Sequence, residues 1–389
     1  MALSLESPLI ASPSLRHTSP RSTGLLQVAT VGCDALAEAE PQALGLTYWF
    51  DAAPDGEPYA AAVRFEGHRV GLGRQRGPRD SFILCETVER VVPGSGRVAI
   101  TARAVDIASG EWNVSATLIT RPHASVAERR PRRQRSPAKA WASGTTGYGP
   151  VIHVRAPGAH LGAWPASVGV GVVAALTVQS WLGARAHLPV AATLSVSLIA
   201  SVAGLLGARI YYLAEQRPRV PLRPRGLLTA GMCIQGFVLT AMAVATIGVL
   251  VAGVPVGRFL DVTTPGLLFA MTIGRFGCFF GGCCAGRPTA SRWGLWSSDR
   301  RVGVRRIPTQ LFESGLALAL GVAALFAILS GAAHTAGAVF VGAIAAYTLG
   351  RQLLFPLRDL ARKTTHGRTL TAAATATVLV VDILVAVLS

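Results

Sequence analysis

The run LGAWPASVGVGVVAALTVQSWL, Leu161 to Leu182, determines which class of fold this chain can adopt. It holds no charged residue, and a membrane-spanning helix needs about 20 mostly apolar residues. Similar apolar runs follow it at Pro189–Leu213, Leu227–Val254, Pro265–Cys284, Gln310–Leu329, Ala336–Leu357 and Leu370–Leu388. The sequence therefore predicts an all-α polytopic membrane bundle of seven transmembrane helices within residues 161–389.

The fourth run, Pro265–Cys284, is the least hydrophobic, and it carries Arg275 between several glycines. A charge inside a membrane is costly unless it faces a partner or a wet cavity. Glycines allow a ligand or another backbone to come close. We therefore expect this run to be a broken or closely packed helix around a site.

The residues before the membrane half follow a different pattern. Residues 41–122 contain short runs rich in Val, Ile, Thr and aromatic residues, such as SFILCETVERVV, separated by turn sequences such as APDGEP and PGSG. This spacing predicts a small all-β, sandwich-like domain. No catalytic constellation is visible in it, so we expect an accessory or interaction role. Residues 1–40 are expected to form a disordered tail, and residues 123–160, with RRPRRQR, a basic linker.

The charge of the chain is strongly basic, at +17 over 389 residues, although only 15% of the residues are charged. Within residues 161–389, most of the Arg residues stand in short loops between apolar runs, which favours topology signals and anionic lipid headgroups as their role. No recognised nucleic-acid motif accompanies the charge, so nucleic acid is not expected as a partner. No secretory signal is visible at the N-terminus, and the first membrane segment is expected to direct targeting.

The six cysteines do not form the framework of a small secreted domain. Cys33 and Cys85 would pair in an oxidising compartment or remain two separate buried thiols. Three others follow the pattern C-x4-C-C at the end of the fourth run, as Cys278, Cys283 and Cys284. Plain packing, a thiol role and a metal site are all open for these three, although no His lies nearby in sequence.

Arg275 is the first candidate for chemistry. Its planar guanidinium suits a phosphate group, and Gly274 and Gly277 beside it would let a ligand approach. The alternative is a structural Arg paired with an acid such as Asp261 or Glu313.

Later runs deliver further polar groups to one side of the membrane. Gln310 and Glu313 lie near the start of one predicted helix, about one turn apart. Tyr347 and Arg351 are four residues apart and therefore share a helical face. Arg358 follows shortly after Pro356.

These blocks resemble, in order, those of the prolipoprotein diacylglyceryl transferase family. The blocks that carry the resemblance are GARIYY (Gly207–Tyr212), AGMCIQG (Ala230–Gly236), GRFGCFFGGCCAG (Gly274–Gly286), PTQLFES (Pro308–Ser314) and the pair Tyr347 and Arg351. Together they span about residues 165–388, and the seven predicted helices agree with the family.

The resemblance implies a reaction in the inner (plasma) membrane. The diacylglyceryl group of phosphatidylglycerol would pass to the thiol of a lipobox cysteine in a prolipoprotein, with release of glycerol-1-phosphate and no cofactor. Arg275 and Arg351 would hold the phosphate, with Tyr347 and Glu313 supporting them and Gln235 at the position of the family's histidine. The resemblance places substrate-binding residues at Arg209, Gly274, Gly277, Gln310 and Arg358.

The chain departs from the family pattern at several polar positions. Gln235 stands where the family has His, and Gln cannot act as a general base. The two signature Asn positions are Cys278 and Gly281, and the signature Glu is Cys283. This Gly-Cys-Cys-x-Gly signature marks a divergent branch, and its alternative function is a non-catalytic protein that binds anionic phospholipid and recruits a partner through its N-terminal domain.

The loop charges and the family resemblance predict opposite orientations. Arg and Lys gather in the loops on the side that bears the motifs, which the positive-inside rule places in the cytoplasm. The family's site lies on the outer face, and some of these Arg residues would be functional.

Overall fold

The computed structural model describes residues 24–29, 36, 39–71, 77–121, 139–215, 233–332, 335–360 and 366–388. Cys33, residues 230–232, most of the predicted tail and residues 123–138 of the predicted basic linker lie outside the described residues. The chain divides into two compact units. One comprises Met1–Leu161 and Pro288–Arg306, and the other comprises Gly162–Arg287 and Ile307–Ser389.

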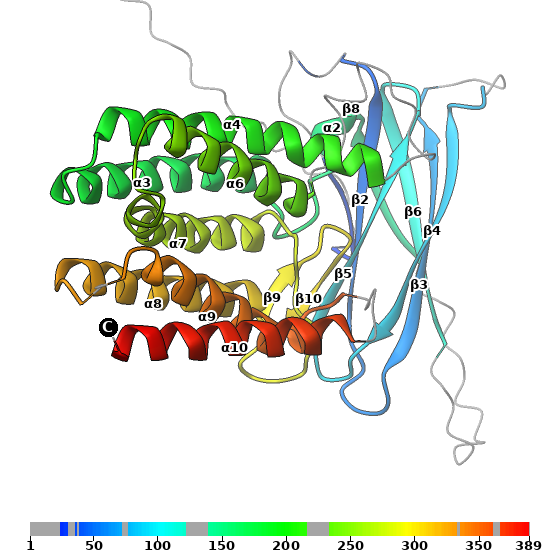
Figure 1. The fold of residues 1–389 in the computed structure, drawn as a ribbon. Helices are drawn as coiled ribbons and strands as arrows, with labels where there is room; N and C mark the ends of the chain where they lie inside the picture. The colour runs from blue at the N-terminus through cyan, green and yellow to red at the C-terminus, as the bar shows by residue number, and fades with distance from the viewer. Residues whose placement is uncertain are drawn as a thin grey trace, which may run out of the picture. The chain divides into compact units, whose positions relative to one another are not determined.

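The first unit contains two antiparallel sheets (Figure 1). The six-stranded sheet has the order β1 (Leu26–Ala29), β2 (Gln42–Asp51), β5 (Arg97–Val105), β10 (Val302–Arg306) and β9 (Leu295–Ser298), with β8 (Gly147–Tyr148) also pairing with β2. The four-stranded sheet has the order β4 (Ser81–Val91), β3 (Tyr59–Arg69), β6 (Glu111–Arg121) and β7 (Lys139–Thr145). A single turn of helix, α2 (Gly149–Ile152), follows β8.

One hydrophobic core joins the two sheets. Along β3 the side chains alternate, so that Val63 and Phe65 are buried while Arg64 is exposed. They pack in the same core as Leu44 of β2 and Ile100 of β5. The expected sheet-rich N-terminal region is confirmed, and its two sheets share a core as in a sandwich.

The strands extend beyond the boundaries that the sequence predicted. β1 lies in the expected tail, and β7, β8 and α2 lie in the expected basic linker. β9 and β10 come from the segment between two helices of the membrane half, where Val302 pairs with Ile100 of β5. These strands form because residues distant in the chain supply the hydrogen-bonding partners, and no local pattern reveals such a pairing.

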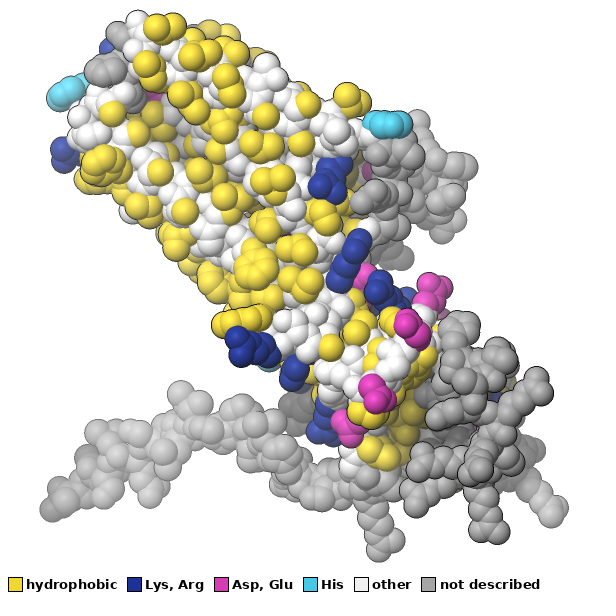
Figure 2. Space-filling model, turned by 90° about the horizontal axis from the view of Figure 1, so that it is seen from below, with side chains coloured by type: hydrophobic (Ala, Val, Ile, Leu, Met, Phe, Trp, Pro, Cys, Tyr) yellow, Lys and Arg dark blue, Asp and Glu magenta, His cyan; other side chains and the backbone are white. Residues whose placement is uncertain are grey.

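The second unit is a bundle of helices: α3 (Ala163–Arg185), α4 (Val190–Glu215), α6 (Ile234–Val251), α7 (Val256–Phe280), α8 (Thr309–Leu329), α9 (Ala338–Leu354) and α10 (Gly367–Leu388). A 3-10 turn, η1 (Phe355–Leu357), extends α9. Among the described residues, six of these helices are long and apolar enough to cross a membrane, and α7 is not among them. Figure 2 shows hydrophobic side chains over the visible face of the bundle. The chain is therefore a multi-pass membrane protein.

The helix α7 departs from the expected fourth span. It begins at Val256 rather than Pro265, ends at Phe280 rather than Cys284, and carries Arg258, Asp261 and Arg275. Figure 1 shows α7 between α3 on one side and α8 and α9 on the other. Neighbouring helices cover much of α7, so it does not need the apolar surface of a lipid-facing helix.

Small residues allow α7 to pack closely on α3. A Cβ atom on Gly266 would lie 2.5 Å from the carbonyl oxygen of Ala175, and one on Gly277 would lie 2.6 Å from Cβ of Ser167. Backbones that approach this closely need glycine at the contact. The glycine contacts with α3 fix α7 inside the bundle. By contrast, α10 has no buried residue.

Candidate active site

Glu313 is the centre of a buried group of charges in the described part of the bundle. Its side chain is fully buried on the second turn of α8. Its Oε2 lies 2.8 Å from Nε of Arg275 on α7, and its Oε1 lies 3.6 Å from a terminal nitrogen of Arg358. A carboxylate in such a place is stable only when it is paired, because removal from water penalises the charge. The sequence alternative of an Arg275–Glu313 pair is therefore what the structure contains.

Arg358 reaches Glu313 because of how the chain leaves α9. After η1, the residue takes an extended conformation and bridges to Gly286, in the loop that follows α7. Its side chain is only 4% exposed. Two guanidiniums thus share one buried carboxylate, which leaves a net positive charge at the site.

Tyr347 comes to the same group from α9. Its side chain is 4% exposed, and it interacts with the guanidinium of Arg275. Arg351 lies one turn further along the same face of α9. Arg351 is partly exposed and makes no ion pair with any residue that the structure describes. One turn beyond Tyr347, α9 therefore carries a cation that pairs with no carboxylate in the described part of the chain.

Hydrogen bonds between α7 and α8 align Arg275 with Glu313. Ser314 Oγ donates to the carbonyl oxygen of Thr272 at 3.0 Å. Thr272 Oγ1 donates to the carbonyl oxygen of Leu268 at 3.0 Å within α7 and also lies 3.4 Å from the carbonyl oxygen of Ser314. Thr272 lies one turn before Arg275 on α7, and Ser314 follows Glu313 on α8. Sequence reasoning missed this reciprocal pair. Hydroxyl residues at matching depth in two neighbouring spans were the available signal.

Gln310 forms a hydrogen bond with the loop after α7 rather than with the buried group of Arg275, Glu313 and Arg358. Its Nε2 donates to the carbonyl oxygen of Cys283 at 3.0 Å, and its side chain is buried. The same loop is tied at its other end, where Arg287 N donates to the carbonyl oxygen of Leu357 at 2.9 Å. Gly286 has no room for a side chain, since a Cβ atom there would lie 2.0 Å from the carbonyl oxygen of Ile307. The loop is thus fixed on both sides.

The two glycines beside Arg275 have different environments. Gly277 packs against α3, so its role in the structure is helix contact. A Cβ atom on Gly274 would meet nothing within 4 Å, so the space beside that residue is open. Of the two glycines expected to contact a substrate, only Gly274 borders open space.

The blocks around Arg209 and Gln235 lie on a separate pair of helices. α4 and α6 cross where a Cβ atom on Gly236 would lie 2.4 Å from the carbonyl oxygen of Gly207. Gln235 is exposed at the start of α6, and its Oε1 accepts a hydrogen bond from Cys233 Sγ at 2.7 Å. Arg209 is partly buried on α4. The structure does not bring Gln235 into hydrogen-bonding contact with Arg275 or Glu313.

Three thiols gather beside the buried charges. The Sγ atoms of Cys278, Cys283 and Cys284 all lie within 4.8 Å of one another. Hydrogen bonds from the other two thiols, followed by the positive charges of Arg358 and Arg275, lower the pKa of Cys284. The C-x4-C-C pattern of the sequence therefore forms a compact cluster at the site.

The match to known proteins covers most of these elements. The family model for prolipoprotein diacylglyceryl transferase matches residues 152–388, which is more than half of the chain. The chain belongs to this family. The matched residues include the buried charges, the cysteine cluster and the α4–α6 pair.

Curated relatives carry the corresponding name, phosphatidylglycerol–prolipoprotein diacylglyceryl transferase. One from Chloroflexus aggregans is 40% identical over 25% of this chain and 33% of its own length. One from Dehalococcoides mccartyi is 29% identical over 40% of this chain and 63% of its own. A second enzyme of Streptomyces coelicolor is 35% identical over 40% of this chain and 53% of its own. The alignments thus span from a third to somewhat under two thirds of these relatives.

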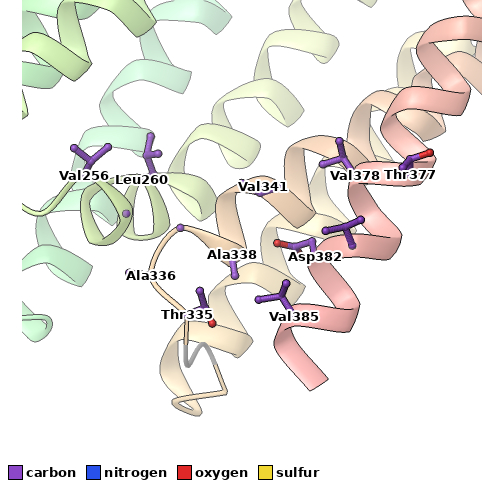
Figure 3. A pocket seen from close by; sticks show the side chains of 13 residues that line it. Val256, Leu260, Thr335, Ala336, Ala338, Val341, Thr377, Val378, Asp382 and Val385 are labelled. Carbon is purple, nitrogen blue, oxygen red and sulfur yellow. The ribbon is translucent and has the colours of Figure 1, made fainter. Parts of the chain in front are cut away.

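A cavity in this transferase-family bundle lies away from the buried charges. A hollow of about 470 Å³ is lined by the starts of α7 and α9 and by the last turns of α10, with Asp382 pointing into it (Figure 3). Arg275 stands near the other end of α7. Close to the hollow, Asp261 accepts hydrogen bonds from the backbone nitrogens of Gly337 at 2.7 Å and Phe340 at 3.2 Å. Asp261 therefore caps the first turn of α9 instead of pairing with Arg275.

Proposed function

We propose that this chain transfers the diacylglyceryl group of phosphatidylglycerol to the thiol of a lipobox cysteine in prolipoproteins. Membership of the prolipoprotein diacylglyceryl transferase family supports this reaction. The observation that carries it in this chain is the buried Arg275–Glu313–Arg358 group with Arg351 and Tyr347 beside it. Membership also disfavours the alternative of a non-catalytic lipid-binding protein.

The charges suit a phosphodiester. Glu313 engages Arg275 through Nε, so its carboxylate does not occupy the terminal nitrogens of the guanidinium, which are the atoms that bind phosphate oxygens. Arg351 adds a cation with no carboxylate partner in the described part of the chain. Three guanidiniums against one carboxylate leave a surplus positive charge, so an anionic headgroup is bound in preference to a zwitterionic one.

The reaction needs charge stabilisation at the leaving group. The acceptor sulfur forms a bond to the terminal glyceryl carbon, and the carbon–oxygen bond to the phosphate breaks. Glycerol-1-phosphate leaves with that electron pair, so negative charge grows on the phosphate as the bond lengthens. Arg275 and Arg351 stabilise this growing charge more than the ground state, which is the condition for catalysis. Tyr347 keeps Arg275 oriented from α9, and Arg358 balances Glu313 from the opposite side.

The proposed location is the inner (plasma) membrane, with α7 as a seventh crossing. Strand pairing supports this count. β10 belongs to the same sheet as β5, so residues 288–306 lie on the same side of the membrane as the N-terminal sheets. If α3, α4 and α6 each cross the membrane, the chain returns to that side only if α7 crosses as well.

Complementation combined with a purified assay tests the function. Wild-type chain is expected to restore growth of a strain depleted of its own diacylglyceryl transferase, and Arg275→Ala is expected to fail. Arg258→Ala is the matched control, because Arg258 is an exposed Arg on the same helix. In detergent, release of glycerol-1-phosphate must depend on both phosphatidylglycerol and a lipobox peptide. Growth with Arg275→Ala, or phosphate release without the peptide thiol, contradicts the proposal.

A further inference from the structure

The cysteine cluster has the ligand arrangement of a metal site. Cys278 lies in the last turn of α7, and Cys283 and Cys284 follow in the next loop. All three sulfur atoms lie within 4.8 Å of one another. Zinc binds thiolate sulfur at about 2.3 Å, so two sulfurs of a tetrahedral site lie about 3.8 Å apart. The three sulfurs, which are at most 4.8 Å apart, are therefore within about 1 Å of that spacing. Soft thiolate ligands select zinc and similar ions over hard cations.

The backbone holds the cluster in place before any ion binds. Cys283 N donates to the carbonyl oxygen of Cys278 at 3.0 Å, and Gln310 holds the carbonyl oxygen of Cys283. Cys284 has a φ angle of 56°, in the left-handed region that residues with a side chain rarely adopt. Such a conformation persists only where the surrounding structure holds it. Here the residue that adopts it is the one that places the Cys284 sulfur beside those of Cys278 and Cys283.

The charges around the cluster fit a divalent ion. The positive charges of Arg358 and Arg275 both interact with the thiol of Cys284, and the charge of Arg275 also interacts with the thiol of Cys278. Three thiolates and a divalent ion carry a net charge of −1, and the group of Arg275, Arg358 and Glu313 carries +1. Three thiolates with a divalent ion therefore offset the surplus charge of the two guanidiniums that share Glu313, which favours binding in a mostly buried place, and the charge of Arg351 remains for the headgroup.

We propose that Cys278, Cys283 and Cys284 bind one zinc-class ion whose fourth coordination position is open to the acceptor thiol. Catalytic zinc sites characteristically have three protein ligands and one exchangeable position. The role of the fourth position rests on the proposed function. A lipobox cysteine that binds there loses its proton to solvent, because a coordinating thiol is deprotonated by the ion. Its sulfur then attacks the glyceryl carbon, and glycerol-1-phosphate leaves with the electrons of the broken carbon–oxygen bond.

This arrangement supplies what the chain lacks at Gln235. A glutamine cannot take a proton from the acceptor, and Gln235 is bonded to Cys233 instead of the buried charges. A metal ion next to Arg275 activates the acceptor thiol without a general base. The same residues that remove the family's polar signature, Cys278 and Cys283, then provide two of its ligands.

Metal binding is measured on the purified full-length chain with Cd²⁺ or Co²⁺ alone. We expect one ion per chain and a thiolate-to-metal charge-transfer band. Cys278→Ser and Cys284→Gly should each weaken binding at least roughly tenfold, the size expected for a lost ligand or supporting group. Glycine at position 284 suits the left-handed backbone, so this variant removes the thiol without disturbing the loop. Cys85→Ser and Cys233→Ser are controls that should bind as wild type does.

Binding that survives Cys284→Gly, or that disappears with Cys85→Ser, overturns the metal site. A disulfide among the three cysteines in the isolated protein, found by mass spectrometry without reduction, overturns it as well. For the fourth position, a lipobox peptide should change the visible spectrum of the Co²⁺ form, whereas the same peptide with Ser in place of Cys should not. An unchanged spectrum with the thiol peptide overturns that part.

The outcomes separate this inference from the proposed function. A Cys284→Gly chain that binds no ion yet transfers the diacylglyceryl group at the wild-type rate disproves the role of the ion and leaves the transferase standing. A wild-type chain that binds one ion at the three cysteines but transfers nothing keeps the metal site and disproves the transferase.

Discussion

Oε2 of Glu313 lies 2.8 Å from Nε of Arg275, and these two side chains come from different helices at the same depth of the bundle. The contact uses the inner nitrogen of the guanidinium, so Glu313 does not cover the outer edge of Arg275, where Tyr347 also interacts. Glu313 has no exposed surface, and Arg358 approaches its other oxygen. The carboxylate thus orients a phosphate-binding group, which is a positioning role in the proposed reaction.

Replacement of Glu313 by Gln should remove most of the activity. The change keeps the shape of the side chain but leaves two buried guanidiniums without a carboxylate, and breaking a buried ion pair costs about 3–5 kcal/mol. We expect a lower thermal midpoint in detergent and a fall in kcat of at least roughly 100-fold, since each 1.36 kcal/mol is tenfold in rate. Activity and melting are measured on the same preparation.

The matched control for this substitution is Arg258→Gln, which changes an exposed charge on α7 and should leave melting unchanged. Wild-type melting and kcat in Glu313→Gln would mean that the ion pair does not orient Arg275.

Arg351 should govern affinity for the headgroup. It has no carboxylate partner among the described residues, and a hydrogen bond to a charged group contributes about 1.5–3 kcal/mol. Arg351→Ala should raise KM for phosphatidylglycerol roughly 10- to 100-fold and reduce kcat as well. Arg351→Lys keeps the charge but loses the planar fork, so it should recover only part of the binding. Steady-state kinetics in mixed micelles provides the comparison, and equal KM for wild type and Arg351→Ala would exclude a headgroup contact.

The membrane half was predictable because its signals are local. An apolar run such as Leu161–Leu182 is recognised as a membrane span from its own length and composition, because the thickness of the bilayer sets the length that a spanning helix needs. The pairing of Arg275 with Glu313 was also within reach as one alternative, because a charge inside a membrane needs a partner. The contacts of Gln310 with the loop after α7 and of Gly277 with α3 could not be predicted, because each depends on a neighbour that is distant in sequence.

The rest of the fold depends on contacts that a sequence window cannot contain. Val302 in β10 pairs with Ile100 in β5, although four long helices separate these residues along the chain. The sequence of α7 is too polar for a typical membrane span because α7 is surrounded by other helices of the bundle rather than by lipid. Asp261 was one expected partner of Arg275, yet it caps α9 instead. In each case the deciding partner comes from tertiary packing.

Glycine at position 286 should be indispensable, whereas Gly274 should tolerate a methyl group. A Cβ atom on Gly286 would lie 2.0 Å from the carbonyl oxygen of Ile307, so Gly286→Ala must displace the loop that carries Cys283 and Cys284. Overpacking of this kind costs about 1–3 kcal/mol or more. We expect a lower melting temperature for Gly286→Ala and a wild-type value for Gly274→Ala. If both variants melt alike, the loop is not fixed as described.

Asp261 should stabilise the start of α9. Its carboxylate accepts two backbone hydrogen bonds, and Asp261→Ala leaves both donors without that acceptor at a cost of about 1–3 kcal/mol. Asp382 lies close enough for its charge to interact with Asp261, so Asp382→Asn should be neutral or slightly stabilising. Thermal unfolding in detergent separates the two. A greater loss for Asp382→Asn than for Asp261→Ala would contradict this assignment.

Labelling from one side of the membrane should place the N-terminal sheets and residues 288–306 in the same compartment. Cys85 is an exposed native thiol on β4, and Arg292 is exposed in the second segment. In intact spheroplasts, a membrane-impermeant maleimide should label Cys85 in a chain whose other cysteines are serine. It should likewise label Arg292→Cys in a background without the native thiols.

We expect labelling before lysis, because the proposed reaction meets prolipoproteins on the outer face. The basic loops oppose this orientation, since the positive-inside rule would retain them in the cytoplasm. Different results at the two positions would contradict the shared sheet and the crossing by α7. Labelling at both positions only after lysis would keep the sheet and the crossing but exclude modification of exported prolipoproteins, because the site would then face a compartment in which the acceptor thiol is not presented.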